Sequence, residues 1–426
     1  MKKFYLKKIS ASKRNNLLTR KAISPITVKY TVEHICNNVK QNGLKAAVDY
    51  AYKIDGLTSK NIYVTQKEFD EAEKELSIEI KNAIKAAYKN IYKFHKLQYP
   101  KKYSVETVSG VKCERKFIPI ENVGLYIPAG TAPLPSTMLM LGIPAQIAGC
   151  KRVVVASPAK DKINPAILYA AKLCGIKEFV KIGGAHGISL LAYGDKKFKK
   201  VDKIFGPGNQ FVTAAKSFIN ADPEGCAIDM IAGPSELLII ADKFAKSDFV
   251  ASDLLSQAEH GKDSVVVLLT TEEPLFDKVN LSLTGQLKKL PRKDFAQNAL
   301  KNSFCLIVDS LNKAFEFSND FAPEHLILNL KNSDKYLNKV VNAGSVFVGE
   351  FSPESAGDYA SGTNHSLPTY GFARSSGGVS VDMFMKGVTF QFITKTGIKN
   401  LSKTIITLAE TESLKAHAEA VRVRLK

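Results

Sequence analysis

The chain has 426 residues, of which 45% are hydrophobic, and its formal net charge is +19. Domains hold roughly 150 residues, so this length predicts about three folding units rather than one core. No apolar run approaches the roughly 20 residues of a membrane helix, and the lysine-rich start has no signal-peptide core. Six cysteines without a CxxC pair are typical of reduced thiols. We therefore expect a cytoplasmic protein without a membrane segment.

The lysine excess raises the alternative that the protein binds nucleic acid or another anion. The lysines are spread over the chain, often with acidic residues close by, and they form no basic tail. Neither an aromatic RNA-binding signature nor a helix-turn-helix pattern accompanies them. We favour a solvated, lysine-rich surface and expect no nucleic-acid partner.

The first hundred residues predict helices. Residues 1–24 are polar and basic, which indicates an arm or a short helix. Residues 59–99 keep apolar side chains three and four positions apart, and the segment TQKE from Thr65 to Glu68 is typical of a capping box. This stretch predicts one long helix or two shorter ones.

The middle of the chain alternates strand-like and helix-like segments in two series. The first series starts with RVVVASP at Arg152 and ends with a helix over residues 209–218. The second runs from LLIIAD at Leu237 to HLILNL at His325, and a helical pattern follows from about residue 400. Such alternation indicates parallel sheets covered by helices. The predicted fold class is α/β, with two similar parallel-sheet units.

Two glycine-rich segments each close a predicted strand and open a helix: GGAHG at Gly183–Gly187 and GPGN at Gly206–Asn209. Free backbone N–H groups at such turns can bind phosphate. Neither segment has the GxGxxG spacing of a dinucleotide site, and glycine-rich turns are common without a ligand. Taken alone, these segments are compatible both with a purely structural turn and with a cofactor-binding site.

Polar candidates for catalysis lie in two further segments. Gln257 and His260 are three residues apart on a predicted helix and so share one face. Glu324 and His325 stand in FAPEHL, directly before a predicted strand. Adjacent strand residues point to opposite faces, so Glu324 and His325 can serve one site only if the turn continues through them. A solvated helix face and a polar turn remain the alternatives.

The segment GEFSPESAGDYASGTNHSLP, at Gly349–Pro368, carries Asp358 and His365 among small residues directly after the strand-like run GSVFVG. Loops at strand ends that hold carboxylates and imidazoles are typical of ligand sites. Together with VGLYIPAG, IFGPGNQF, AGPSE, SQAEHGKDS and FAPEHL, this segment resembles the histidinol dehydrogenases. The resemblance runs from about Val123 to the C-terminus.

The resemblance implies two similar, incomplete Rossmann-like domains with small helical segments at both termini. We expect an N-terminal arm at residues 1–24 and a discontinuous catalytic domain at residues 25–126 and 237–380. An NAD-binding domain is expected at residues 127–236, and a helical tail at residues 381–426 that reaches the partner subunit of a homodimer with shared active sites.

The resemblance also implies an NAD-dependent and zinc-dependent oxidation of L-histidinol through L-histidinaldehyde to L-histidine. Glu324 and His325 match the family's catalytic pair. The residues that match the zinc ligands are Gln257, His260, Asp358 and His417. The residues that match substrate contacts are Ser235, Glu412 and His325, together with the four zinc ligands.

The residues that match the family's NAD contacts are Tyr126, His186 and Asn209. At the position of His186 the family typically has glutamine, and where this chain has PAG at Pro128–Gly130 the family typically has PGG. His365 is a further candidate only because it lies in the same loop as Asp358.

Other histidines and the cysteines have less support. His34 and His95 match no family motif, and we expect ordinary helix or surface residues. The nearest enzyme alternative is an aldehyde dehydrogenase with a cysteine nucleophile, for which Cys150 and Cys113 would be the candidates. No motif that lowers a thiol pKa accompanies either cysteine.

Overall fold

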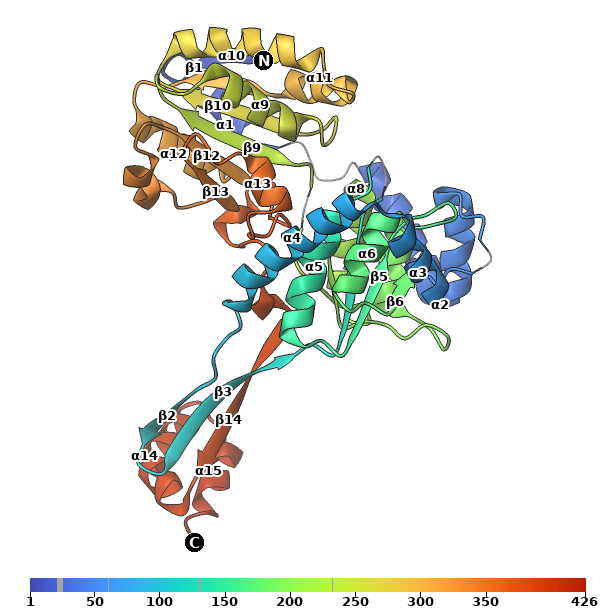
Figure 1. Ribbon diagram of the computed structural model, residues 1–426. Coiled ribbons are helices and arrows are strands. Elements are labelled where there is room, and N and C mark those ends of the chain that lie inside the picture. The colour runs from blue at the N-terminus through green and yellow to red at the C-terminus, as the bar shows by residue number, and fades with distance from the viewer. Residues whose placement is uncertain (21–25, 60, 130–131, 232) are drawn as a thin grey trace.

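The computed structural model describes residues 1–20, 26–59, 61–129, 132–231 and 233–426. Figure 1 shows two sheets covered by helices and an elongated third part that ends in the C-terminus. No described helix is long and apolar enough to cross a membrane. The α/β class predicted from the alternating pattern is confirmed.

A six-stranded parallel sheet forms the upper part of the molecule in Figure 1. Its strands, in spatial order, are β1 (Lys2–Tyr5), β11 (Phe304–Ile307), β10 (Val265–Thr270), β9 (Glu236–Ala241), β12 (His325–Asn329) and β13 (Ser345–Val348). Strands buried on both faces read as continuous apolar runs, and the interior strands here are of that kind. From β9 onward the local order is 3-2-1-4-5, as in a Rossmann fold.

Helices cover both faces of this sheet because alternate strand residues point to opposite sides. Leu237 and Ile239 contribute to one apolar cluster, whereas Leu238 and Ile240 contribute to the other. The first cluster is covered by α9 (Ser247–Ala258), α10 (Glu273–Leu287) and α11 (Lys293–Asn302). The second is covered by α1 (Ala11–Leu18) and α12 (Leu311–Phe321).

Short elements follow the last two strands of the sheet. A 3₁₀ segment, η3 (Ser333–Lys339), comes after β12, and α13 (Glu354–Tyr359) comes after β13. Two further 3₁₀ turns, η4 (Phe372–Arg374) and η5 (Val381–Phe384), lead the chain away from this sheet.

The second parallel sheet has five strands in the same local order, 3-2-1-4-5. They are β6 (Glu178–Val180), β5 (Arg152–Ala156), β4 (Asn122–Tyr126), β7 (Lys203–Phe205) and β8 (Ala227–Ile228). Among the described residues, neither sheet carries a sixth strand beyond local strand 5. Two similar, incomplete Rossmann-like units are therefore present, as predicted.

Helices also cover both faces of the five-stranded sheet. One face carries α5 (Pro135–Ala148), α6 (Pro165–Leu173), α3 (Gln66–Glu75) and α4 (Ile78–Lys96). The other carries α7 (Gly184–Tyr193), α8 (Gln210–Ala221) and α2 (Ile26–Tyr50), with a π-helical turn η2 (Ala51–Asp55) after α2.

The predicted domain boundaries therefore need correction. We expected residues 25–126 to fold with residues 237–380, but helices α2, α3 and α4 bury their apolar faces against the five-stranded sheet. Strand β4, within the predicted first domain, lies at the centre of that sheet. Helical periodicity shows that a face is buried but not which sheet covers it, so the sequence could not assign these helices.

The helices predicted over residues 59–99 are two, α3 and α4. Thr65 and Glu68 form the predicted capping box: the Glu68 N–H donates to Thr65 Oγ1 at 3.3 Å, and the Thr65 N–H donates to Glu68 Oε2 at 2.7 Å. The N-terminal arm differs from the prediction, since residues 2–5 form the edge strand β1, and η1 (Leu6–Lys8) and α1 follow it.

The tail contains a sheet that the sequence analysis missed. Strands β2 (Tyr103–Val108), β3 (Val111–Pro119) and β14 (Met385–Ile393) form an antiparallel sheet in the order β14-β3-β2. Helices α14 (Lys395–Thr411) and α15 (Lys415–Arg422) follow it. The segment 381–426 was predicted to be helical, but its first part is β14, whose partner strands are more than 250 residues away in the sequence.

Candidate active site

Glu324 and His325 lie where β12 begins, beside the start of β9. The Glu236 N–H donates to Glu324 Oε2 at 2.8 Å, and His325 Nδ1 lies 3.2 Å from the Glu236 carbonyl oxygen. His325 pairs with Leu237 in the parallel ladder. A Cβ on Gly344 would come within 2.6 Å of the Glu324 carbonyl oxygen, so glycine permits this close turn. The start of β12 therefore orients both side chains toward one site. This meets the condition that the sequence analysis set for a site shared by Glu324 and His325.

The two side chains are buried and electrostatically linked. Glu324 is 7% exposed and His325 is 4% exposed, and 3.6 Å separates Glu324 Oε2 from His325 Nδ1. Burial raises the pKa of Glu324 above its usual value. Burial acts to lower the pKa of His325, but the nearby carboxylates of Glu324, Glu354 and Asp358 together hold that pKa well above its usual value. The acids around His325 thus stabilise the imidazolium that forms when its ring takes up a proton.

Asp358, on α13, gathers three imidazoles. Its Oδ1 lies 3.7 Å from His325 Nε2 and 3.8 Å from His365 Nδ1, and its Oδ2 lies 4.0 Å from His260 Nε2. His365 Nε2 is in turn 3.3 Å from Thr137 Oγ1 on α5, so this loop touches the unit of the five-stranded sheet. Residues separated by a hundred positions in the sequence therefore converge between the two sheets.

Gln257 and His260 lie at the end of α9, next to α13. Donor atoms of His260, Glu354 and Asp358 all lie within 4.8 Å of one another. When the Gln257 amide is oriented with its nitrogen toward Glu354, that nitrogen donates to both Glu354 carboxylate oxygens. One imidazole and several oxygens are a donor set suited to zinc, so these residues fit the metal that the resemblance implies.

Glu354 was missed by the sequence analysis. It is 1% exposed, and burial raises its pKa well above the usual value. It stands four residues before Asp358 on α13, and that helical spacing is the signal that would have placed both carboxylates on one face.

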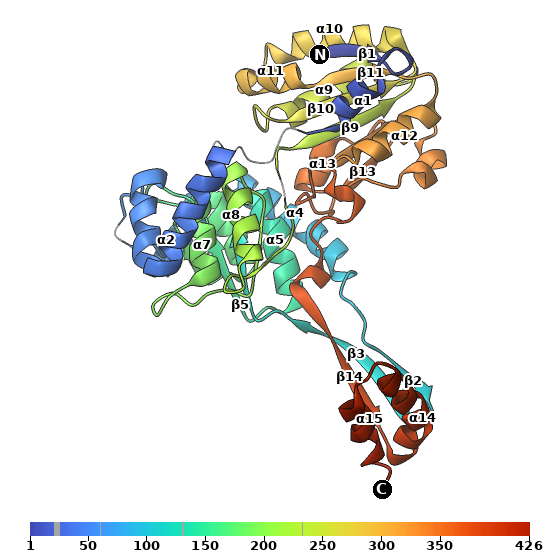
Figure 2. The ribbon, with the colours of Figure 1, turned by 180° about the vertical axis from the view of Figure 1, so that it is seen from behind.

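His417 and Glu412 are not brought to this cluster within one chain. Both are exposed, and they lie at α15 and directly after α14. Figures 1 and 2 show these helices at the far end of the molecule from α9 and α13. Ser235 lies directly before Glu236, where its carbonyl accepts the Val265 N–H at 3.1 Å.

The candidate NAD residues lie along the carboxyl edge of the five-stranded sheet, where α/β folds bind ligands. The Tyr126 hydroxyl accepts the Gly184 N–H at 3.1 Å, and Tyr126 is 3% exposed. Asn209 caps α8 by accepting the N–H groups of Phe211 and Val212, and it is exposed. Tyr126 therefore supports a glycine turn, whereas Asn209 is accessible.

His186, which stands where the family typically has glutamine, faces inward. It is 1% exposed, and its Nε2 lies 3.0 Å from Asp55 Oδ2. The same Asp55 oxygen accepts the Gly183 N–H at 2.9 Å. His186 thus holds a glycine turn through Asp55. The PAG segment ends at Gly130, which lies outside the described residues.

The nearby turn at Gly206 depends on glycine. Gly206 has a φ of +126°, and a Cβ there would collide with the Tyr126 carbonyl oxygen. The Gly206 N–H donates to Asp229 Oδ2 at 2.8 Å, and Lys216 Nζ donates to the Gly206 carbonyl at 2.8 Å. The buried Asp229 and Lys216 side chains therefore fix the backbone of this turn beside Tyr126.

The comparisons with known proteins agree with this geometry. The family model described as histidinol dehydrogenase matches residues 18–425. Relatives named histidinol dehydrogenase from Aliivibrio fischeri and Pseudoalteromonas translucida are 49% and 51% identical; the matches cover 100% and 96% of this chain and 97% and 95% of the relatives. The chain belongs to the histidinol dehydrogenase family.

A solved structure extends the likeness to three dimensions. The crystal structure of histidinol dehydrogenase from Elizabethkingia anophelis matches with a TM-score of 0.94 at 48% identity, covering 100% of this chain and 98% of that chain. Membership in the histidinol dehydrogenase family makes the chain an oxidoreductase.

The cysteine alternative is wrong for a histidinol dehydrogenase family member, and the Cys150 thiol is a poor nucleophile. Burial raises the pKa of Cys150 to about 12, so its thiol stays protonated at neutral pH. Cys113 lies on β3, in the tail sheet. All six cysteines are free.

The remaining histidines behave as expected. His34 is exposed on α2. His95, on α4, is fully buried, with Nδ1 2.9 Å from the Ile91 carbonyl and Nε2 3.2 Å from Asn364 Nδ2. Both are ordinary helix residues, and His95 has a packing role.

Proposed function

We propose that the chain catalyses the NAD-dependent, zinc-dependent, four-electron oxidation of L-histidinol through L-histidinaldehyde to L-histidine. Membership in the histidinol dehydrogenase family supports the substrate. The observation that carries the proposal is the convergence of Glu324, His325, His260 and Asp358 in one partly buried cluster. This reaction needs a base for the hydroxyl proton, a second base for water, and side chains that can bind a metal ion.

The first oxidation removes a proton from the alcohol oxygen and a hydride from the adjacent carbon. His325 is the proposed base for the hydroxyl proton. Its Nδ1 lies 3.2 Å from the Glu236 carbonyl, which can only accept a hydrogen bond, so the neutral ring carries its proton on Nδ1 and presents a free Nε2 to the cluster. A positioned base contributes on the order of 10²–10⁴-fold in rate. The hydride goes to NAD, which gives NADH and the aldehyde.

The second oxidation needs water, because an aldehyde has no hydroxyl hydrogen to lose. Glu324 is the proposed base that takes a proton from water as it adds to the aldehyde carbon. The resulting hydrate then loses a second hydride to a second NAD, again with His325 taking the hydroxyl proton. Burial, which raises the pKa of Glu324, makes its carboxylate a stronger base than an exposed one.

Gln257, His260 and Asp358 are the proposed zinc ligands of this chain. The ion, when bound, would hold the imidazole and amino nitrogens of the substrate and orient its alcohol carbon. His260 keeps 43% of its side chain exposed, so it can approach a ligand from solvent. Ser235, at the start of β9 and next to Glu236, is a proposed substrate contact.

NAD is proposed to lie on the carboxyl edge of the five-stranded sheet. Asn209 is the accessible contact, while Tyr126 and His186 shape the glycine turn beside it. The Thr137 to His365 contact joins this unit to the catalytic cluster, which would let a bound nicotinamide approach the substrate.

We further propose a homodimer in which the tail of one chain completes the site of the other. His417 and Glu412, the remaining zinc ligand and substrate contact, lie far from their own chain's cluster (Figure 2). The tail also exposes large apolar side chains that a partner would cover, namely Phe392, Leu408, Leu414 and Val423. Six free cysteines and the biosynthetic role suit a cytoplasmic location.

The decisive experiment is an assay with L-histidinol and NAD that measures both NADH and L-histidine. We expect two NADH for each histidine, loss of activity after chelation, and recovery on adding zinc or manganese. Full turnover in a demonstrably metal-free preparation would contradict the zinc requirement. Oxidation that stops at the aldehyde, with one NADH, would contradict the four-electron reaction.

A further inference from the structure

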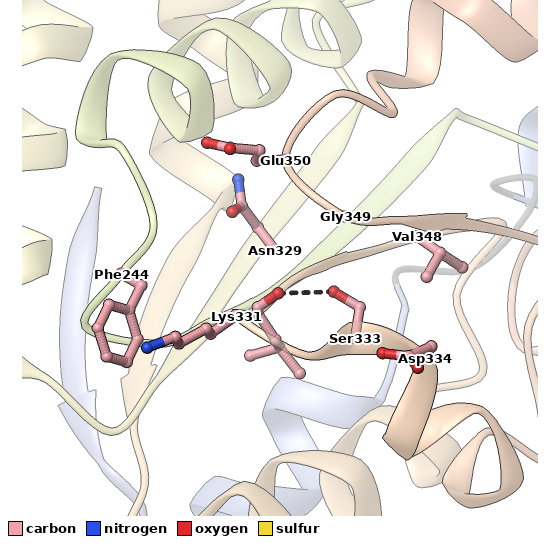
Figure 3. A pocket seen from close by; sticks show the side chains of 9 residues that line it. Phe244, Asn329, Lys331, Ser333, Asp334, Val348, Gly349 and Glu350 are labelled. Atoms are coloured by element: carbon pink, nitrogen blue, oxygen red, sulfur yellow. Dashed lines mark hydrogen bonds between the residues drawn. The ribbon is translucent and has the colours of Figure 1, made fainter.

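A cavity of about 380 Å³ lies at the carboxyl edge of the six-stranded sheet, away from the proposed reaction site. Its walls follow β9, β12 and β13. The residues that line it are Phe244, Asn329, Leu330, Lys331, Ser333, Asp334, Val348, Gly349 and Glu350 (Figure 3). His325 and Asn329 are the two ends of β12, so roughly 13 Å of strand separates the cavity from the catalytic pair.

The position itself favours ligand binding. The strand order reverses between β9 and β12, and open α/β sheets bind ligands in the crevice outside the carboxyl ends at such a switch point. In the five-stranded sheet, which has the same local order, that edge carries the proposed NAD site. In the six-stranded sheet the proposed reaction uses the amino ends of β9 and β12. Its carboxyl edge has no role in that reaction.

The cavity wall is braced by Asp242. Its Oδ1 accepts the Phe244 N–H at 2.9 Å, and its Oδ2 accepts the Lys331 N–H at 3.0 Å. One carboxylate thus ties the loop after β9 to the loop after β12. Ser333 strengthens the same wall, since its hydroxyl donates to the Leu330 carbonyl at 2.8 Å. The cavity is therefore formed before any ligand arrives.

Asn329 is the main reason to expect a ligand. As a residue it is 3% exposed, and its amide makes no hydrogen bond to another described residue. Figure 3 shows the amide inside the cavity, pointing toward Glu350. A primary amide that opens into a cavity can both donate and accept a hydrogen bond with a ligand there.

Charges of both signs line the cavity. Lys331 and Asp334 are both exposed, and neither forms an ion pair with a described residue. The Lys331 Nζ lies 4.4 Å from the Phe244 ring centroid. Glu350 differs, because Lys246 Nζ lies 2.9 Å from its carboxylate. In Figure 3, Lys331 and Asp334 stand on opposite sides of the cavity. A ligand with only a positive or only a negative charge could pair with only one of these two side chains.

We propose that this cavity binds a free α-amino acid whose side chain ends in a neutral group with both a hydrogen-bond donor and an acceptor, an imidazole or a carboxamide. The ligand carboxylate pairs with Lys331 and its ammonium with Asp334. The side chain lies over Leu330 and Val348, and its end group satisfies the Asn329 amide. The site is separate from the proposed reaction site and does not depend on the metal.

L-glutamine is the primary probe, because it carries a carboxamide and is not the proposed substrate or product. Calorimetric titration of the whole protein should give one binding event per chain with L-glutamine. L-leucine, which has similar size but no polar end, should bind at least tenfold more weakly, since it leaves Asn329 unpaired. If L-glutamine fails to bind at millimolar concentration, the assignment is overturned.

Variants separate the cavity from general surface effects. Lys331→Met should weaken L-glutamine binding about tenfold, which corresponds to ~1.4 kcal/mol, whereas Lys335→Met removes the same charge from η3 outside the cavity and should leave binding unchanged. Histidinol oxidation should be the same in both variants. Equal affinities for L-glutamine in both variants would show that it binds elsewhere. If the unmodified protein does not oxidise histidinol, the proposed function is wrong, but the L-glutamine binding experiment can still be interpreted.

Discussion

At the scale of single residues, the backbone of Glu236 organises the catalytic pair. Its N–H is the donor to Glu324, and its carbonyl is the partner of His325 Nδ1. Its side chain forms a buried ion pair with Arg20, at 3.0 Å, and accepts the Tyr370 N–H at 3.0 Å. Fixed neighbours of this kind hold a base in position, which matters because proton transfer depends on geometry.

The two proposed bases should separate in a mutant pair. His325→Asn should slow both oxidations, by about 10²–10⁴-fold, because both need a base for a hydroxyl proton. Glu324→Gln should slow hydration most, so alcohol oxidation should proceed further than the full reaction. NADH formation is measured with L-histidinol and, separately, with supplied L-histidinaldehyde. Equal losses on both substrates in both variants would argue against distinct roles.

Glu354 should support the metal site through Gln257, because its carboxylate accepts hydrogen bonds from the Gln257 amide nitrogen and so fixes that side chain. Glu354→Gln should weaken zinc binding about 10–100-fold, the usual effect of losing a partner behind a ligand. Zinc affinity is measured by competition with a coloured chelator. Glu350→Gln, on the more exposed surface four residues earlier, is the matched control. Unchanged zinc affinity in Glu354→Gln would remove this role.

At the scale of elements, α9 carries an uncompensated buried carboxyl. Asp253 is 9% exposed, and burial raises its pKa to about 7 from a usual value near 3.8. The folded state therefore binds more protons than the unfolded state between these two pH values. Stability falls as pH rises through this range, and the loss is complete above pH 7.

Asp253→Asn should remove that pH-dependent loss. At about 1.4 kcal/mol per pKa unit, the stability of the variant relative to the unmodified protein should be roughly 4 kcal/mol more favourable at pH 8 than at pH 4. The cost of burying the amide is the same at both pH values and cancels in this comparison. Urea unfolding at both pH values measures the difference. Asp248→Asn, at the exposed start of the same helix, should show no such gain. A stability difference that does not change with pH would contradict the raised pKa.

Element patterns explain what the sequence could and could not predict. The alternation around β9, β10 and β12 gave the parallel sheet, because each buried strand is a short apolar run. The pair β3 and β14 is different, since the antiparallel partner of Val111 is Ile393, and three of the nine residues of β3 and six of the nine of β14 are exposed. No local pattern links residues so distant. The candidate metal ligands could likewise be grouped only through the family resemblance, because His260 and Asp358 are far apart in the sequence and come together only in the folded chain.

At the scale of the whole molecule, the elongated tail separates His417 from the other proposed zinc ligands. Figure 1 shows the C-terminal helices at the opposite end from α9 and α13. Helix α15 buries only Ala418 and Val421, and it exposes both His417 and the apolar Val423. A part that covers so little apolar surface within its own chain fits the proposed homodimer, in which a second chain would cover it.

The shared-site arrangement should appear as complementation between inactive variants. Asp358→Ala and His417→Ala homodimers should each be nearly inactive, because each lacks a proposed ligand in both sites. In a mixed dimer, the unmutated Asp358 of one chain meets the unmutated His417 of the other, so one intact site and about half of the normal activity should return. Co-expression with two different affinity tags isolates the mixed dimer, and NADH formation is its readout.

One control decides how that result is interpreted. A mixed dimer of Asp358→Ala with His260→Ala should stay inactive, since both changes remove ligands that one chain brings together, and each site of this dimer lacks one of them. Recovery in this control would mean that His260 and Asp358 of one site come from different chains. If the verified Asp358→Ala and His417→Ala mixed dimer is as inactive as its parents, the tail does not complete the partner's site, and His417 acts within its own chain or has no role in metal binding.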